Sequence, residues 1–201
     1  PTDRKNSKKL KYIIKFFVSD IFCSLLFPPF FLYPLGFIIF PFFYFTLVES
    51  KYKKLSKFIQ FINGFFFGFG LNLIVLYWVR EPFSFNVSTT NFSFLAFLLI
   101  FYISIYFGFA FLFLSFFKHN FSKLILIPVI FVIAEIVREN FLFGFPWISF
   151  AVVASSNYYL LQIAYFIGTN GLSYLIILLY FVPISIFYLA DKKINFFHKI
   201  N

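Results

Sequence analysis

The sequence has few charged residues: Asp, Glu, Lys and Arg make up only 12% of its 201 residues. A soluble domain carries about 25% charged residues, because water must wet its surface. Hydrophobic residues make up 62% of the chain, and the mean hydropathy is +0.91. Methionine is absent, and phenylalanine occurs 40 times. The phenylalanines fit a lipid environment, because lipid-facing positions accept Phe as readily as Leu. This composition excludes a soluble globular domain and predicts an integral membrane protein.

Cysteine and histidine are also scarce. The single cysteine, Cys23, excludes an internal disulfide and a metal cluster held by cysteines. Cys23 lies inside an apolar run with no histidine nearby, which favours a buried, inert thiol over a nucleophile. His119 and His198 stand beside lysines in polar stretches and are typical of solvated loops. The sequence therefore predicts no metal site and no cofactor.

Apolar runs long enough to cross a bilayer recur along the chain, and we expect about six of them. A further apolar segment, residues 148–168, is interrupted by polar residues and indicates a broken, partly inserted or interfacial stretch. The predicted fold class is an all-α integral membrane protein. It would form a bundle of about six transmembrane helices, with the broken segment on the outer side. Residues 1–201 would form one membrane domain without a soluble domain, and its spans are roughly 12–27, 30–48, 58–79, 92–117, 124–141 and 169–190.

The basic residues predict how the chain is oriented. Of 17 Lys and Arg residues, 15 fall into four stretches: six in 4–15, four in 51–57, two in 118–123 and three in 192–199. Only Arg80 and Arg138 remain for the other side. Because basic residues mark the cytoplasmic face, both termini are expected in the cytoplasm, with the loops near 28–34, 80–91 and 138–168 outside. The net charge of +10 is then an orientation signal and needs no nucleic-acid partner.

The run 58–79 combines small and polar residues. Gly64, Gly68 and Gly70 have the small-residue spacing that lets membrane helices approach closely. Asn72 lies in the middle of this run, and an interhelical hydrogen bond is favoured there over a role as a site group. Trp78 reaches the outer interface, where tryptophan is commonly an anchor.

The stretch AEIVRENFLFGFPW, residues 134–147, places charges beside a helix breaker. Glu135 and Arg138 are three residues apart and share one helix face near the outer end of their span. They could pair with each other, or Arg138 could offer its planar fork to a lipid phosphate while Glu135 holds it. Spacing alone leaves both interpretations open.

The turn after this helix, residues 144–147, favours a lipid-binding site over a simple ion pair. Gly144 permits a positive φ or a close backbone approach, and Pro146 stops the helix. The ring of Trp147 suits the depth of lipid headgroups. Irregular backbone at membrane depth is tolerated only where protein or a watery cavity shelters it. We therefore expect this turn to line a cavity that opens to the outer leaflet.

These motifs resemble the membrane region of apolipoprotein N-acyltransferases. That family shows a Glu-x-x-Arg, a Gly-Phe-Pro-Trp turn and then a Gln-(Ile/Leu)-Ala…Gly…Gly-(Leu/Val)-Ser run. Weaker likenesses are FPPFFLYPLGF and the glycine-rich GFFFGFGLNLIVLYWV, which ends beside Trp78. The matching residues are Glu135, Arg138, Gly144, Phe145, Pro146, Trp147, Gln162, Ile163, Ala164, Gly168, Gly171 and Ser173.

The resemblance implies a function in lipoprotein biosynthesis at the bacterial plasma (inner) membrane. The family transfers an acyl chain from a phospholipid to the amino group of the N-terminal diacylglyceryl-cysteine of lipoproteins. Its Glu-Lys-Cys set lies in a nitrilase-like domain on the outer face. The transfer has two steps and passes through a thioester on the cysteine, which suits a thiolate nucleophile. The membrane part docks that domain and admits both lipids sideways. The candidates for lipid binding or domain docking are then Glu135, Arg138, Gly144, Phe145, Pro146, Trp147 and Trp78.

No segment of the 201 residues would supply the Glu-Lys-Cys set, so no residue is assigned a catalytic role. The chain by itself is expected to be inactive. An alternative is a non-catalytic membrane platform, or a truncated remnant, that binds lipid or a nitrilase-like domain supplied in trans. A small transporter is disfavoured, because the midplane offers only Asp20 and Asn72 and no inverted repeat is evident.

Overall fold

The computed structural model describes residues 2–52, 55–117, 120–141 and 144–187. In these ranges every regular element is helical and there is no strand, which confirms the predicted all-α class. The α-helices are α1 (Thr2–Ser24), α2 (Gly36–Tyr52), α3 (Lys57–Val75), α4 (Leu95–Leu114), α5 (Asn120–Asn140) and α6 (Tyr158–Tyr180). Short 3-10 helices are η1 (Tyr33–Leu35), η2 (Tyr77–Ser84), η3 (Thr90–Phe92) and η4 (Phe150–Ser156).

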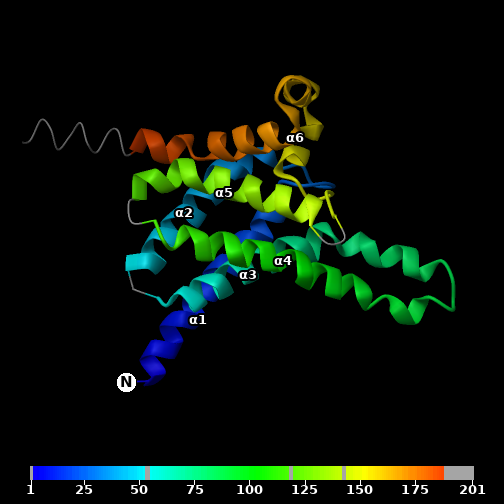
Figure 1. Ribbon diagram of the computed structural model, residues 1–201, viewed down its shortest axis with the longest axis horizontal. Coiled ribbons are helices and arrows are strands. Elements are labelled where there is room, and N and C mark those ends of the chain that lie inside the picture. The colour runs from blue at the N-terminus through cyan, green and yellow to red at the C-terminus, as the bar shows by residue number, and fades with distance from the viewer. Residues whose placement is uncertain (1, 53–54, 118–119, 142–143, 188–201) are drawn as a thin grey trace, which may run out of the picture.

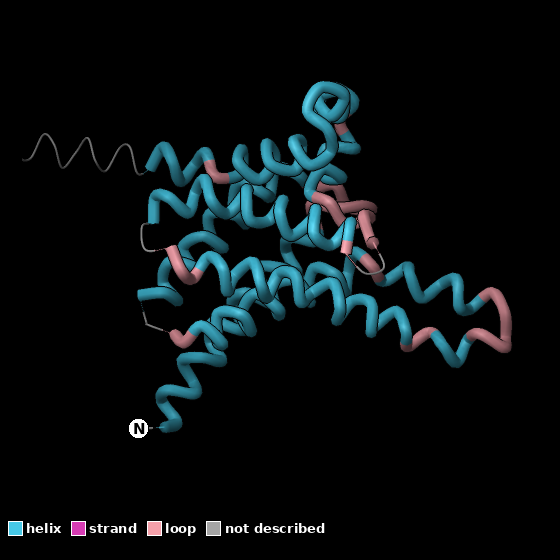
Figure 2. Tube along the Cα trace, in the orientation of Figure 1, coloured by secondary structure: helices cyan, strands magenta, loops and turns pink. Residues whose placement is uncertain are grey.

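The helices form a closed bundle. Helix α1 packs on α3, α3 on α4, α4 on α5 and α5 on α6, while α2 closes the ring by packing on both α6 and α1. Figure 1 shows α3, α4, α5 and the last part of α6 side by side, with α1 crossing at an angle. The segment between α3 and α4, which contains η2 and η3, projects as a long hairpin beyond the other helices (Figure 2).

Three helical segments of the described chain are long and apolar enough to cross a membrane: Lys57–Val75, Thr90–Leu114 and Tyr158–Tyr180. A shorter apolar helix covers Tyr33–Glu49. These segments support a membrane protein, whereas the number of crossings stays a prediction. Residues 188–190 of the predicted last span lie outside the described residues, as do Lys53, Lys54, Lys118, His119, Lys192, Lys193, His198 and Lys199.

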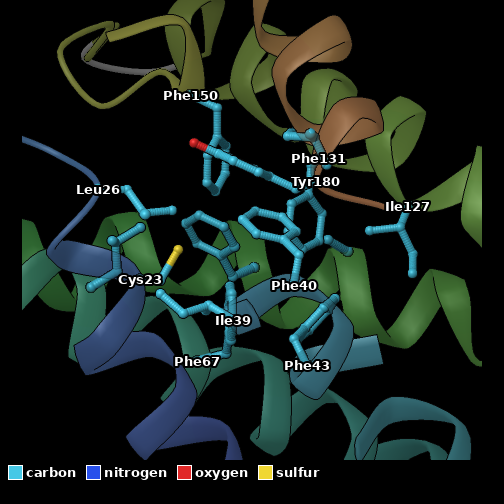
Figure 3. Close-up of a cluster of buried hydrophobic side chains, with 14 of the residues drawn as sticks. Cys23, Leu26, Ile39, Phe40, Phe43, Phe67, Ile127, Phe131, Phe150 and Tyr180 are labelled. Carbon is cyan, nitrogen blue, oxygen red and sulfur yellow. The ribbon is translucent and has the colours of Figure 1, made fainter. Parts of the chain in front are cut away.

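Aromatic rings fill the interior of the ring of helices (Figure 3). Phe43 of α2 lies 4.9 Å from Phe67 of α3, and Phe40 stacks on Tyr180 of α6 at 5.0 Å between ring centroids. Phe150 of η4 reaches into the same cluster and lies 5.8 Å from Phe40. Because lipid is as apolar as these rings, shape-matched packing rather than burial from water stabilises the cluster. This packing fixes η4 against the bundle.

The glycines of α3 permit the close contact with α4. A Cβ atom at Gly64 would lie 2.4 Å from the carbonyl oxygen of Phe107, and one at Gly68 would meet the Phe107 ring at the same distance. The side-chain amide of Asn72 donates to Ser104 Oγ of α4 at 3.3 Å. This contact confirms the interhelical hydrogen bond favoured for Asn72.

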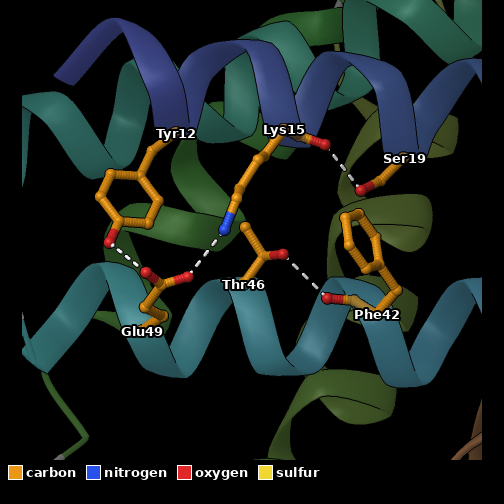
Figure 4. A network of polar contacts seen from close by, with 6 residues as sticks. All are labelled: Tyr12, Lys15, Ser19, Phe42, Thr46 and Glu49. Carbon is orange, nitrogen blue, oxygen red and sulfur yellow. Dashed lines mark hydrogen bonds and ion pairs between the residues drawn. The ribbon is translucent and has the colours of Figure 1, made fainter. Parts of the chain in front are cut away.

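A polar cluster joins α1 to the end of α2 (Figure 4). Tyr12 Oη donates to Glu49 Oε1 at 2.9 Å, and Lys15 Nζ donates to Glu49 Oε2 at 2.8 Å. Glu49 follows the apolar run 30–48, and the hydrogen bond from Lys15 is the main cause that lowers the pKa of Glu49 below its usual 4.5. The start of α3 lies at the same end of the bundle as this polar cluster. There Lys57 Nζ of α3 lies 3.9 Å from the ring centroid of Phe116, which follows α4.

Candidate functional site

Helix α5 ends in a turn that brings the chain back over its own last residues. The amide of Phe145 donates to the carbonyl oxygen of Arg138 at 3.2 Å and so caps the helix. Gly144 has a φ of +53°, and a Cβ atom there would lie 2.9 Å from the carbonyl oxygen of Glu139. Both facts require glycine, since an L side chain rarely adopts this backbone conformation.

Glu135 is buried, with 4% of its surface exposed, and its carboxylate holds the chain after the turn. Glu135 Oε1 accepts from the amide of Phe150 at 2.8 Å, and Oε2 accepts from Ser149 Oγ at 3.0 Å. Ser149 Oγ also lies 2.6 Å from Ser173 Oγ of α6, which accepts from the amide of Ala151 at 2.9 Å. This network links α5, η4 and α6 at one point.

Arg138 is buried as well, with 2% of its surface exposed. Its Nη2 donates to the carbonyl oxygen of Ile148, while Nε is buried without a hydrogen-bond partner among the described residues. The ion pairs found in the described part of the chain, within 4.0 Å, do not include Glu135 with Arg138. In this arrangement both side chains bind the segment after the turn rather than each other. Contact between Arg138 and a lipid phosphate stays a prediction.

Trp78 and Trp147 come from distant parts of the sequence and meet in space. Their rings stack at 4.9 Å between centroids and 14° between planes. Phe145 lies 5.4 Å from Trp147 on the same side. Trp78 is 45% exposed and Trp147 is 58% exposed, so the pair forms a ledge on the surface. The sequence predicted both residues at the outer end of the bundle, but it gave no sign that they stack.

The segment predicted to be broken is broken in the structure. Asn157 caps the start of α6 by accepting from the amides of Tyr159 and Leu160. At Gly168, with φ +72° and ψ 172°, the helix kinks. Figure 1 shows the part before this kink almost end-on, whereas the part after it runs along the bundle. Tyr165 and Phe166, in the first part, are 88% and 82% exposed.

The structure therefore brings the predicted site residues to one corner of the bundle. Glu135 and Arg138 lie beneath the turn, Gly144 and Pro146 shape it, and the aromatic ledge covers it. Sequence reasoning did not single out Ser149 or Ile148. Ser149 lies directly before η4, where serine is a favoured cap, but the sequence did not predict η4 and so offered no signal for Ser149.

The sequence model of one family, described as the apolipoprotein N-acyltransferase N-terminal domain, matches residues 19–182. The match begins within α1, ends just after α6 and contains every residue of the corner. A search of curated proteins finds no match.

Proposed function

Because the chain belongs to the apolipoprotein N-acyltransferase family through its N-terminal domain, we propose that it forms the membrane part of a lipoprotein acyl-transfer enzyme. The acyl donor would be a phospholipid, and the acceptor would be the N-terminal diacylglyceryl-cysteine of a lipoprotein. The observation that carries this proposal is the Glu135–Ser149–Ser173 network. This network anchors the segment that follows the Gly-Phe-Pro-Trp turn to α5 and α6, and all of its residues lie within the matched region.

The chemistry itself is assigned to a nitrilase-like domain. Its thiolate would attack the phospholipid ester, release the lysophospholipid and form a thioester, which the lipoprotein amine would then attack. The thiol of Cys23 does not suit this role, because Cys23 is 1% exposed and lies among the core rings (Figure 3). We therefore assign docking and lipid positioning to this chain, and expect it to need the domain for activity.

The aromatic ledge of Trp78 and Trp147 is the proposed contact surface. Tryptophan rings suit the depth of lipid headgroups, where one edge is wet and the other apolar. Arg80 adds a cation beside this surface, with Cζ 3.9 Å from the Tyr77 ring centroid. Glu135 and Arg138 would act as positioning residues that hold the ledge through the turn.

We place the corner at the outer face of the bacterial inner membrane, with six crossings and both termini in the cytoplasm. A cysteine at Val87, which is 90% exposed in the projecting hairpin, should react with a membrane-impermeant maleimide in intact cells. A cysteine at Lys57 should react only after permeabilisation. Native Cys23 is buried and serves as the unreactive background. The reverse labelling pattern would refute this orientation.

Complementation tests the enzymatic role. The chain is expressed alone, and together with a nitrilase-like domain of the family, in bacteria depleted of their own N-acyltransferase. Mass spectrometry of a lipoprotein then measures N-acylation. We expect acylation only with both parts, and less of it with Trp147→Ala than with Ile125→Ala, an exposed residue of α5 away from the corner. Acylation by the chain alone, or none from both parts correctly inserted, would contradict the proposal.

A second candidate is a non-catalytic platform, favoured by the exposed aromatic residues before the Gly168 kink. Tyr158, Tyr159, Tyr165 and Phe166 are each more than 70% exposed, which suits a membrane interface or a docked partner. Co-purification with a nitrilase-like domain, but no acylation by the pair, would support this reading over the enzymatic one.

A further inference from the structure

An apolar groove of about 640 Å³ runs between α4 and α5. Its walls are almost entirely hydrocarbon, and its exposed lining side chains include Phe109, Phe113 and Ile133, each more than half exposed. At about 1.5 Å rise per residue, the distance along α4 from Tyr102 to Phe113 is about 17 Å. A single leaflet of the hydrocarbon core is about 15 Å deep, so the groove is long enough for one acyl chain.

At the Phe116 end of the groove, Lys57 Nζ lies 3.9 Å from the Phe116 ring centroid but is not among the lining residues. The polar side chains among the lining residues, Tyr102 and Tyr106, lie at the opposite end. The hydroxyl groups of Tyr102 and Tyr106 are hydrogen-bonded to each other there, and Tyr102 Oη donates to the carbonyl oxygen of Phe141 at 3.4 Å. Tyr106 also lines a small cavity with Glu135 and Arg138. The polar end therefore adjoins the candidate site and its buried guanidinium. A ligand with an apolar tail and an anionic group next to the tail fits this distribution.

We propose that the groove binds one acyl chain of a bilayer phospholipid, with its phosphate at the Tyr102–Tyr106 end. Away from the two tyrosines, the described residues that line the groove have apolar side chains, so they do not hold ordered water there. An acyl chain restores the dispersion contacts that the wall atoms otherwise lack. Resting on the proposed function, this places a donor lipid directly beside the Gly144–Trp147 turn.

Photo-crosslinking tests the groove. The full chain is reconstituted in phosphatidylglycerol–phosphatidylethanolamine vesicles that contain a phosphatidylethanolamine with a diazirine at the end of one acyl chain. Mass spectrometry then maps the labelled residues. We expect labels concentrated on Phe113, Phe116 and Ile130, at the apolar end of the groove.

A matched pair of variants separates specific binding from lipid that merely surrounds the protein. Ile133→Trp inserts a large ring into the groove, whereas Ile125→Trp alters an equally exposed position on α5 outside it. Ile133→Trp should reduce groove labelling roughly tenfold, because the ring occupies the apolar surface that the chain would cover. Ile125→Trp should leave it unchanged, and circular dichroism checks that both variants are folded.

Three outcomes would overturn the proposal. Labels could spread evenly over all lipid-facing helices, both variants could label like the parent chain, or a diacylglyceryl-cysteine peptide could displace the probe while excess unlabelled phospholipid does not. Labelling is measured without acyl transfer, so the groove proposal and the proposed enzymatic role can each be refuted independently of the other. Groove labelling without acylation in the complemented cells would refute the enzymatic role alone, and acylation without groove labelling would refute the groove alone.

Discussion

Replacing Glu135 should loosen the corner by an amount that depends on whether a hydrogen-bond acceptor remains. Glu135→Ala leaves the buried amide of Phe150 without its acceptor, whereas Ser149 keeps its contact with Ser173. A buried donor without a partner costs about 1–3 kcal/mol. Glu135→Gln retains a carbonyl oxygen for Phe150, and its NH₂ group can donate to Ser149 Oγ.

Both variants remove the negative charge near Arg138, so the difference between them reports the lost hydrogen bonds to Phe150 and Ser149 together with the lost side-chain volume. We expect Glu135→Ala to be less stable than Glu135→Gln by about 1–3 kcal/mol. The free energy of unfolding is measured in mixed micelles by titration with dodecyl sulfate. The chain has two tryptophans, Trp78 and Trp147, so intrinsic fluorescence reports directly on the corner. Amide exchange at Phe150 should accelerate in the Ala variant only.

Glu139 provides the matched control, because it lies one turn further on the same helix, is partly exposed and forms none of the hydrogen bonds between described side chains. Glu139→Ala and Glu139→Gln should agree within about 0.5 kcal/mol. Equal stability of the Ala and Gln variants at Glu135 would refute the claim that the Phe150 amide depends on this carboxylate.

Three other results are expected. A double-mutant cycle of Trp78→Ala and Trp147→Ala should give a coupling energy of about 0.5–1.5 kcal/mol from the stacked rings, and additive losses would show that the rings do not interact. Gly168→Ala should destabilise by about 1–3 kcal/mol through backbone strain alone, because the described residues place no atom within 4 Å of the added Cβ apart from the adjoining backbone; unchanged stability would argue against the kink. The lowered pKa of Glu49 means that its contact with Lys15 stabilises the fold above the usual pKa of about 4.5 and is lost as pH falls through the lower folded value. Both groups are partly exposed, so the effect should stay below about 1 kcal/mol, and Lys15→Met should flatten the pH dependence of unfolding below about pH 5.

The sequence by itself determined that the chain lies in a membrane, that it is helical, and where glycine and proline interrupt the helices. Charge scarcity and long apolar runs dictate a membrane environment, because polar surface is what water requires. Gly144 and Pro146 dictate a turn, since one permits a positive φ and the other stops a helix. The glycine spacing of α3 indicated a close helix contact, and α4 provides it.

Only the tertiary structure decided which residues meet. Three contacts join residues that are separated in the sequence, and no local sequence pattern predicts them. They are Trp78 with Trp147, Arg138 with Ile148, and Ser149 with Ser173. The groove between α4 and α5 likewise depends on which faces turn towards each other. In lipid, an apolar side chain is equally satisfied by a neighbouring helix or by the bilayer, so hydrophobicity does not choose helix partners. Shape-matched packing and a few buried hydrogen bonds make that choice, and both exist only once the helices are assembled.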